Sequence, residues 1–411
     1  MKYWRGYIAA GLMVALTMGL MAFAEAHEKL VDMFYPYMTR LIQSSLADWS
    51  SGIDGCLWQV LAVLLLVVLL ASIVAMIVLR WNFVQWLGWV LAGASMLFML
   101  HTGMYGLNSH AGPLAEDVRL NVTKYTVTEL AEATAYFRDI AGALAHQVPR
   151  NGDDTPDYPE FSQLAELAGD SYETLTYDKY LPVFAGSTAP VKELGWADLY
   201  TPMGITGVTM GLTGEAAVNP QTPVVAQPFV MCHEMAHRMC INLERDANLA
   251  AFMACDVSES PIFRYSGYFM AYRYCYNALL AIGTTSANAA ASEIQSGVDL
   301  LLQADLDAYN EFFFINRNDM ATDIANSAND TYIKVSGDES GVMSYDEVHD
   351  LLVCWYIQEI YLPAHKDEEI EFDPTDKNRV DLSDPVPVIS TDPTEATLPV
   401  ETTLPTEATA G

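Results

Sequence analysis

The 411-residue sequence predicts a mainly α chain of the α+β class, in which three N-terminal transmembrane helices precede a mostly helical domain with a small β-sheet. Three early apolar runs predict the membrane helices, because each is close to the ~20 residues that cross a bilayer. Apolar residues at helical spacing predict most of the remaining elements. A glycine-rich stretch over 203–219, where apolar and small residues partly alternate, predicts extended chain and hence the small sheet.

The three apolar runs cover 7–25, 56–79 and 83–101 and together form a predicted membrane anchor over 1–104. The first run is long enough for either a signal peptide or a spanning helix. The second and third form a hairpin whose short turn contains Arg80, and this turn is cytoplasmic by the positive-inside tendency. Lys2 and Arg5 agree with that orientation. We therefore expect a multi-pass membrane protein in which the chain after the third run faces out of the cell.

A second predicted domain covers 105–365. Between the first two apolar runs, 34–42 is a short amphipathic piece, which we place at the outer surface without a chemical role. In the second domain, Thr126 and Glu129 form a capping-box pattern ahead of a helix that ends near Val148. A similar pattern at 344–347 precedes the last predicted helix, on which His349 is expected at the surface.

The stretch 230–248, V-M-C-H-E-M-A-H-R-M-C-I-N-L-E-R-D-A-N, carries the chemistry. On a helix, His233 and His237 leave the same face one turn apart, so two nitrogens can reach one metal ion. Glu234 lies between them in the H-E-x-x-H arrangement, where two histidines bind zinc and the carboxylate acts as base. A turn near 239–242 lets a second helix fold back and aim Glu244 at the metal as third ligand, with Asn248 supporting the ligands.

These residues predict a zinc metallopeptidase that requires Zn²⁺ and cleaves an unknown peptide or protein. Glu234 takes a proton from the zinc-bound water and passes it to the leaving amine. Two other functions stay open: a catalytically silent metal-binding sensor, and a surface interaction protein that works through its acidic tail. In a silent metal site, His233, His237 and Glu244 would hold the ion without turnover. Without a metal, His233 and His237 would be ordinary helix residues and Glu234 a solvated charge.

Two further features concern the substrate. The stretch 203–219 is either an edge strand along which an extended substrate lies by strand addition, or a structural hairpin with glycine turns. A long helix over 262–282 carries Arg264 and Tyr265, and either side chain is a candidate donor to the oxyanion of the reaction.

Charge and cysteine content exclude other classes of function. The net charge of -32 leaves no basic patch to neutralise phosphates, so nucleic acid is not an expected partner. The segment 366–411 is rich in Pro, Thr and acidic residues and cannot build a core, which predicts a disordered outer tail. No C-x-x-C spacing suggests a thiolate metal site, and a bridge between Cys240 and Cys255 is one alternative to buried free thiols.

At this point the chain resembles a known family through motifs that recur in the same order. They are the three apolar runs, Y-P-Y-M-T-R, Y-G-L-N with P-L, G-I-T-G-V-x-x-x-x-T-G-E-A-x-V-N, H-E-M-A-H with E-R-D-A-N, Y-S-G-Y, and N-D-T-Y-I-K ahead of S-Y-D-E-V. The family consists of bacterial membrane proteins with a domain of unknown function, placed in the zincin-like metallopeptidase superfamily among the Glu-zincins. The resemblance covers about 1–363.

The resemblance implies a zincin-like metallopeptidase domain in a bacterial cell membrane, with zinc ligands at His233 and His237, the base at Glu234, and a third ligand at Glu244 in an E-x-x-A-N motif. Two departures matter. Family members often have Gly at the position of Cys240, and they tend to have Glu where this chain has Asp246. The first departure implies a differently built turn, and the second removes the expectation of a direct role for that acid.

Overall fold

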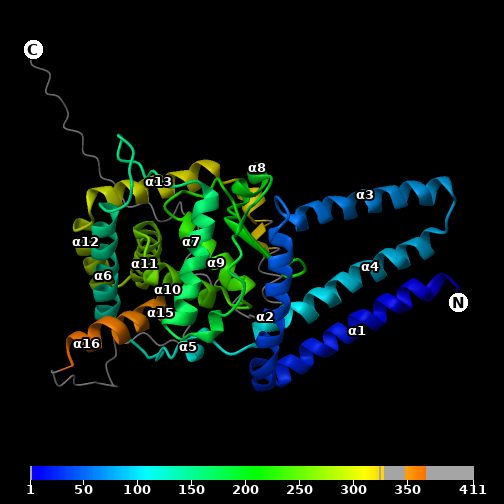
Figure 1. Cartoon of the computed structure of the whole chain (residues 1–411), viewed down its shortest axis with the longest axis horizontal. Helices are drawn as coiled ribbons and strands as arrows, with labels where there is room; N and C mark the ends of the chain where they lie inside the picture. Colours follow the sequence, from blue (N-terminus) through cyan, green and yellow to red (C-terminus); the bar gives the residue numbers. More distant parts are fainter. Residues whose placement is uncertain (1, 324, 328–347, 367–411) are drawn as a thin grey trace, which may run out of the picture.

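The computed structural model describes residues 2–323, 325–327 and 348–366, and within them it confirms a mostly helical chain with a small sheet (Figure 1). Three N-terminal helices are long and apolar enough to cross a membrane. The cap expected at 344–347 and the tail over 367–411 lie outside the described residues. The domain boundaries after 104 and after 365 stay predictions.

The three candidate spans are α1 (Arg5–Ala26), α3 (Leu57–Val78) and α4 (Phe83–Met104), close to the predicted runs. α1 and α4 pack side by side and approach closely where Gly6 meets Gly88, since a Cβ on Gly6 would collide with the main chain of Gly88. Most side chains of α3 are exposed and only Gln59 is buried, as expected of a helix surrounded by lipid. The N-terminus and the α3–α4 turn lie at the ends of the spans away from the helical domain (Figure 1).

The amphipathic piece between the first two spans is longer than the sequence indicated. The structure has a 24-residue helix, α2 (Glu28–Ser51), which continues through Pro36. In Figure 1 this helix stands across the ends of the spans, between them and the rest of the chain. Its side chains contact both the spans and the helical domain, so α2 connects these two parts of the molecule.

The core of the domain is built around α6 (Val127–Ala145) and α11 (Pro261–Ile282), which pack along each other. Both hydrogen bonds of the capping box between Thr126 and Glu129 are present, as predicted. The rings of Phe137, Phe252 and Trp355 lie 4.8 to 6.2 Å apart and join α6 to α10 (Glu244–Val257) and α15 (Val348–Tyr356).

Shorter helices complete the domain: α5 (Leu114–Asp117), α7 (Phe161–Glu173), α8 (Ala197–Tyr200), α12 (Thr285–Ser296), α13 (Leu300–Asn316) and α16 (Leu362–Ala364). The expectation that His349 lies at the surface is wrong. It is 5% exposed, because α15 is covered by α6, α10 and α11. All six cysteines are free and buried, and the bridge between Cys240 and Cys255 is not formed.

The sheet has the order β1-β3-β2, with β1 (Lys192–Glu193) parallel and β2 (Gly207–Met210) antiparallel to the central β3 (Glu215–Val218). The stretch 203–219 is thus a hairpin, and its first strand is also a sheet edge among the described residues. Glu215 fixes the sheet to a span, because its two carboxylate oxygens accept from the amides of Leu57 and Trp58 at 2.7 and 2.8 Å.

Candidate metal centre

The H-E-x-x-H motif lies on α9 (Gln227–Arg238), as predicted. Pro228 occupies the first turn, where the missing amide hydrogen costs the helix no bond. Every residue of α9 is buried, because the helix packs against β2, β3, α7, α10 and α11. Its polar side chains must therefore find partners inside the protein.

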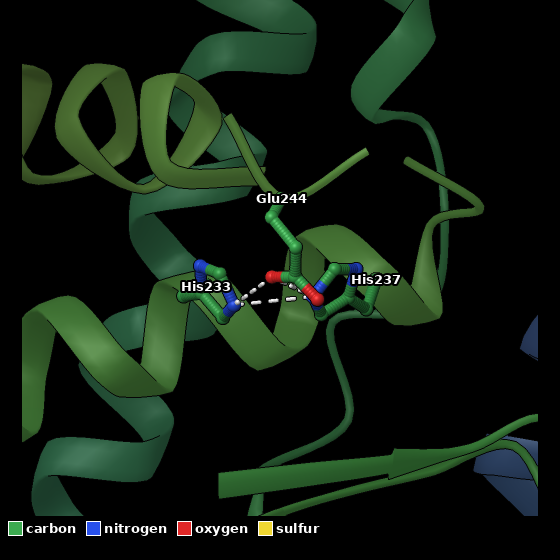
Figure 2. A group of neighbouring side chains, drawn as sticks. All are labelled: His233, His237 and Glu244. Atoms are coloured by element: carbon green, nitrogen blue, oxygen red, sulfur yellow. Dashed lines mark hydrogen bonds and ion pairs between the residues drawn. The ribbon is translucent and has the colours of Figure 1, made fainter. Parts of the chain in front are cut away.

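Three polar side chains, two from α9 and one from α10, converge on one point (Figure 2). The Nε2 atoms of His233 and His237 lie 3.1 Å apart, and Oε2 of Glu244 lies 3.3 Å from the first and 3.2 Å from the second. Glu244 is the first residue of α10, which returns after the turn at 239–243 and so aims its carboxylate back at α9. The three side chains are each 10 or 11% exposed. The structure brings together the three residues that the sequence predicted as ligands.

The arrangement fits a metal ion by distance and by donor type. In a tetrahedral zinc site with bonds of about 2.0–2.1 Å, neighbouring ligand atoms lie about 3.3–3.4 Å apart. The three atoms here are 3.1 to 3.3 Å apart. Two imidazole nitrogens and one carboxylate oxygen also form the ligand set of catalytic zinc sites that keep a fourth position open. This group is therefore a possible metal-binding triad.

The electrostatics of the triad favour a bound cation. Burial lowers the pKa of His237, but the charge and hydrogen bond of Glu244 outweigh it and raise that pKa to about 9. Burial raises the pKa of Glu244, but the two histidines outweigh it and hold that pKa far below its usual range. Glu244 thus stays an anion, and a metal ion would compete with the proton that His237 otherwise holds.

The main chain orients one of the two imidazoles. Nδ1 of His237 lies 2.8 Å from the carbonyl oxygen of Ile241, which can only accept, so the ring hydrogen belongs on Nδ1 and the lone pair of Nε2 faces the triad. Nδ1 of His233 is buried without a hydrogen-bond partner among the described residues. The two ligands are therefore held differently.

The turn after α9 explains why that carbonyl lies where it does. The amide of Ile241 donates to Ala236 and that of Cys240 to His237, at 3.1 and 2.9 Å, which is the Schellman pattern of a helix end. In this pattern the residue at the position of Cys240 adopts a left-handed conformation, and its φ is 69°. Glycine is favoured there, so this chain places a side chain at a position that disfavours one.

Glu234, the predicted base, is 5% exposed and lies against β2. The hydroxyl of Thr209 lies 2.7 Å from Oε2 of Glu234 and donates to it. A Cβ at Gly207 would collide with Oε1, so the close approach of β2 depends on glycine. Burial raises the pKa of Glu234, while the two histidines and Thr209 oppose the rise. A carboxylate with a raised pKa is suited to accept a proton near neutral pH.

Two further residues of the E-R-D-A-N segment, Asp246 and Asn248, are buried. Oδ2 of Asp246 accepts from the amide of Leu114 at 2.9 Å, so the shorter acid anchors the start of α5. Asn248, expected to support the ligands, is 2% exposed, and the Tyr274 hydroxyl lies 3.4 Å from its Oδ1.

The expectation that Tyr265 donates to an oxyanion is wrong, because its hydroxyl is buried and donates to Asp305. Sequence reasoning in turn missed Thr209 and Gly207 as partners of Glu234. The glycine-rich stretch signalled a close approach of the main chain, but spacing alone did not show which side chain it approaches.

Comparison with known proteins places the chain by family alone. No curated protein and no solved structure matches it. A family model described as "Protein of unknown function (DUF3810)" matches residues 31–353, a range that contains most of α2, the candidate spans α3 and α4, the sheet and the possible metal-binding triad. The chain therefore belongs to the DUF3810 family.

Proposed function

We propose that this chain is a membrane-anchored zinc metallopeptidase of the zincin-like superfamily. One observation carries the proposal: two histidines and a glutamate converge within 3.3 Å of one another, while a buried glutamate with a raised pKa lies between those histidines in sequence. A structural zinc site is usually closed by four protein ligands, whereas three protein ligands beside an acidic residue are typical of a catalytic zinc site.

The site residues divide the work of peptide hydrolysis. His233, His237 and Glu244 would hold the zinc, which supplies an activated water and polarises the peptide carbonyl. Thr209 holds Oε2 of Glu234, so Oε1 is the oxygen that remains to receive a proton. Glu234 then passes that proton to the leaving amine, which could not depart as an anion. Burial raises the pKa of Glu234, which favours its acceptance of the proton.

The edge strand β2 supports a polypeptide as the substrate. It pairs with β3 along one side only among the described residues, and its first residue, Gly207, touches Glu234. An extended peptide added to this edge would pass directly over the proposed base. Which peptide bond is cut depends on side-chain pockets that the edge itself does not define.

An orientation with the site outside the cell follows from charge. The N-terminus, which carries Lys2 and Arg5, and the α3–α4 turn, which carries Arg80, lie at the ends of the spans opposite the helical domain (Figure 1), and basic residues favour the cytoplasmic side. The proposal therefore places the metal centre on the outer face of a bacterial cell membrane.

Metal content and turnover test the proposal together. The full chain, purified in nanodiscs, is expected to hold one zinc, and His237→Ala and Glu244→Ala are expected to hold far less, while His146→Ala, an exposed histidine with a carboxylate partner, serves as the matched control. Glu234→Gln should keep its zinc and lose cleavage of a peptide library. A parent that binds no zinc would end the metallopeptidase proposal. Equal cleavage by Glu234→Gln would leave only a metal-binding protein.

A further inference from the structure

α2 connects two candidate spans on the same side of the bilayer. α1 ends at Ala26 and α2 begins at Glu28, while α2 ends at Ser51 and α3 begins at Leu57. α4 also ends on this side, and Figure 1 shows α2 lying across the ends of all three spans. A helix tied at both ends to spans in this way must lie close to the bilayer surface, whichever side of the cell that surface faces.

α2 also has the side chains of an interfacial helix. Thr39, Gln43 and Ala47 are at most 2% exposed and face the rest of the protein. The other side carries large apolar residues at helical spacing, each 37 to 66% exposed: Leu30, Met33, Phe34, Met38, Ile42 and Trp49. We call these six residues the α2 stripe. Such a stripe suits a helix that lies in the boundary between headgroups and acyl chains.

Short contacts connect α2 and the end of α4 to the metal centre. Nε of Arg40 on α2 donates to the carbonyl of Met239 at 3.1 Å, in the turn that directly follows α9. Nδ2 of Asn242 lies 3.4 Å from the carbonyl oxygen of Tyr105, the residue that directly follows α4. Since Glu244 is two residues beyond Asn242, and two residues span at most about 7 Å, the third ligand lies within roughly 15 Å of the end of a span.

The edge strand β2 runs from the metal centre to the end of α4. Gly207 at its start lies against Glu234, and Gly211 just after its end lies against the ring of Tyr105. Nε2 of Gln43 bonds the carbonyls of both Gly211 and Met104, at 2.8 and 3.2 Å, and so ties the strand end to the span end. A peptide extended along β2 therefore has one end at the membrane level and the other at the proposed base.

We propose that the α2 stripe is embedded in the bilayer that α1, α3 and α4 cross, and that it holds the metal centre beside the membrane surface, so that the substrate is a polypeptide segment next to its own membrane anchor. The substrate part rests on the proposed peptidase function, whereas the placement of α2 does not. Five extended residues cover about 17 Å, so a bond within about ten residues of an anchor can reach the site.

The placement of α2 is tested by depth. A nitroxide label at Phe34→Cys or Met38→Cys, each at a 56% exposed position, is compared in nanodiscs with a label at Leu300→Cys, an 86% exposed position on α13. The six native thiols are buried and should stay unlabelled. Labels on α2 should be relaxed more by oxygen, which partitions into the bilayer, than by a water-soluble nickel chelate. The label at position 300 should show the opposite order. Labels on α2 that meet the chelate as freely as the label at 300 would overturn the placement.

The substrate class is tested with a tethered polypeptide. Six identical ten-residue repeats, prepared as a pool of different repeat sequences, are attached by either end to a lipid in the nanodisc, and the cuts are mapped by mass spectrometry. Because every repeat offers the same bonds, cuts concentrated at least about fivefold in the repeat next to the lipid would support the proposal. Evenly spread cuts that vanish in Glu234→Gln would overturn it and leave the peptidase function intact. A zinc-loaded chain that cuts no repeat would overturn both.

Discussion

Two buried clusters of charge on different elements of the domain have opposite designs. In the first, Arg150 on the loop after α6 forms two hydrogen bonds with Asp305 on α13, at 3.2 and 2.7 Å, and Tyr265 donates to the same carboxylate. One cation meets one anion there. In the second, two ring nitrogens of His233 and His237 and a carboxylate oxygen of Glu244 point at one another, and the charge of Glu234 acts on both histidines.

This difference distinguishes a buried charge cluster that stabilises the fold from one that can bind a cation. Buried polar groups are stable when each meets its complement, and the cluster of Arg150 and Asp305 is complete in this sense. The triad lacks such completeness, because its three atoms are all potential acceptors and only a proton or a metal ion between them removes the conflict. A buried cluster that requires an added cation is a site, whereas one that neutralises itself holds the fold together.

The largest expected effect is on stability, at the self-contained cluster. Asp305→Ala leaves the Arg150 guanidinium without its partner, 9% exposed, and should cost about 3–5 kcal/mol of folding free energy. The melting temperature of the full chain in detergent should fall by about 10 °C. Zinc content per folded chain should stay at the parental level. An unchanged melting temperature would mean that this ion pair does not support the fold.

The next effect is on metal affinity, at the triad. His237→Ala removes one of three ligands, and zinc affinity should fall more than about 100-fold, since even partners outside the ligand set are worth 10–100-fold. Glu244→Gln should weaken zinc equally, yet it should destabilise the metal-free chain less than Asp305→Ala does, because it removes an anion that otherwise needs a shared proton. Competition with a chelator measures the zinc affinities. If metal-free Glu244→Gln is destabilised as much as Asp305→Ala, then the two clusters do not differ in this way.

Local pattern predicted the triad better than it predicted the surroundings of the triad. The spacing of His233 and His237 follows from the helix itself, and the return of Glu244 needs only a short turn. By contrast, the sheet brings Thr209 to Glu234 from 25 residues away. Nothing in a sequence period connects those two positions, so this contact became visible only in the folded chain.

The membrane helices show the same limit. Apolar length predicted the three spans, because a bilayer requires it. The role of α2 in connecting the spans to the domain was missed, because its sequence indicates only a short amphipathic piece. The contacts that make this connection join Arg40 and Gln43 to partners 199 and 168 residues away. Tyr265 was misassigned for a related reason: its partner Asp305 lies on a helix 40 residues further along the chain.

A smaller effect should separate the base from the ligands. Thr209→Val keeps the shape of the side chain but removes the donor to Oε2 of Glu234, so cleavage should slow by about tenfold while zinc content stays unchanged. Loss of that donor should also raise the pKa of Glu234 further, since the hydrogen bond opposes the rise. The acid limb of the cleavage rate should then move to higher pH. A rate profile that keeps its midpoint would show that Thr209 does not act through Glu234.

The smallest expected effect concerns the turn that connects the two ligand helices. Cys240 has a φ of 69°, and a non-glycine residue in this region costs roughly 1–2 kcal/mol, so Cys240→Gly should relieve part of that strain. Glycine also gives the unfolded chain more freedom, which leaves a net gain of about 1 kcal/mol at most. The control is Cys275→Gly, a buried helical position where glycine should destabilise. If Cys240→Gly lowers the melting temperature instead, then the packing of the thiol near Arg40 and Asn108 outweighs the strain. If it raises the melting temperature and leaves zinc affinity unchanged, then the Schellman turn places the Ile241 carbonyl on His237 by its main-chain bonds alone.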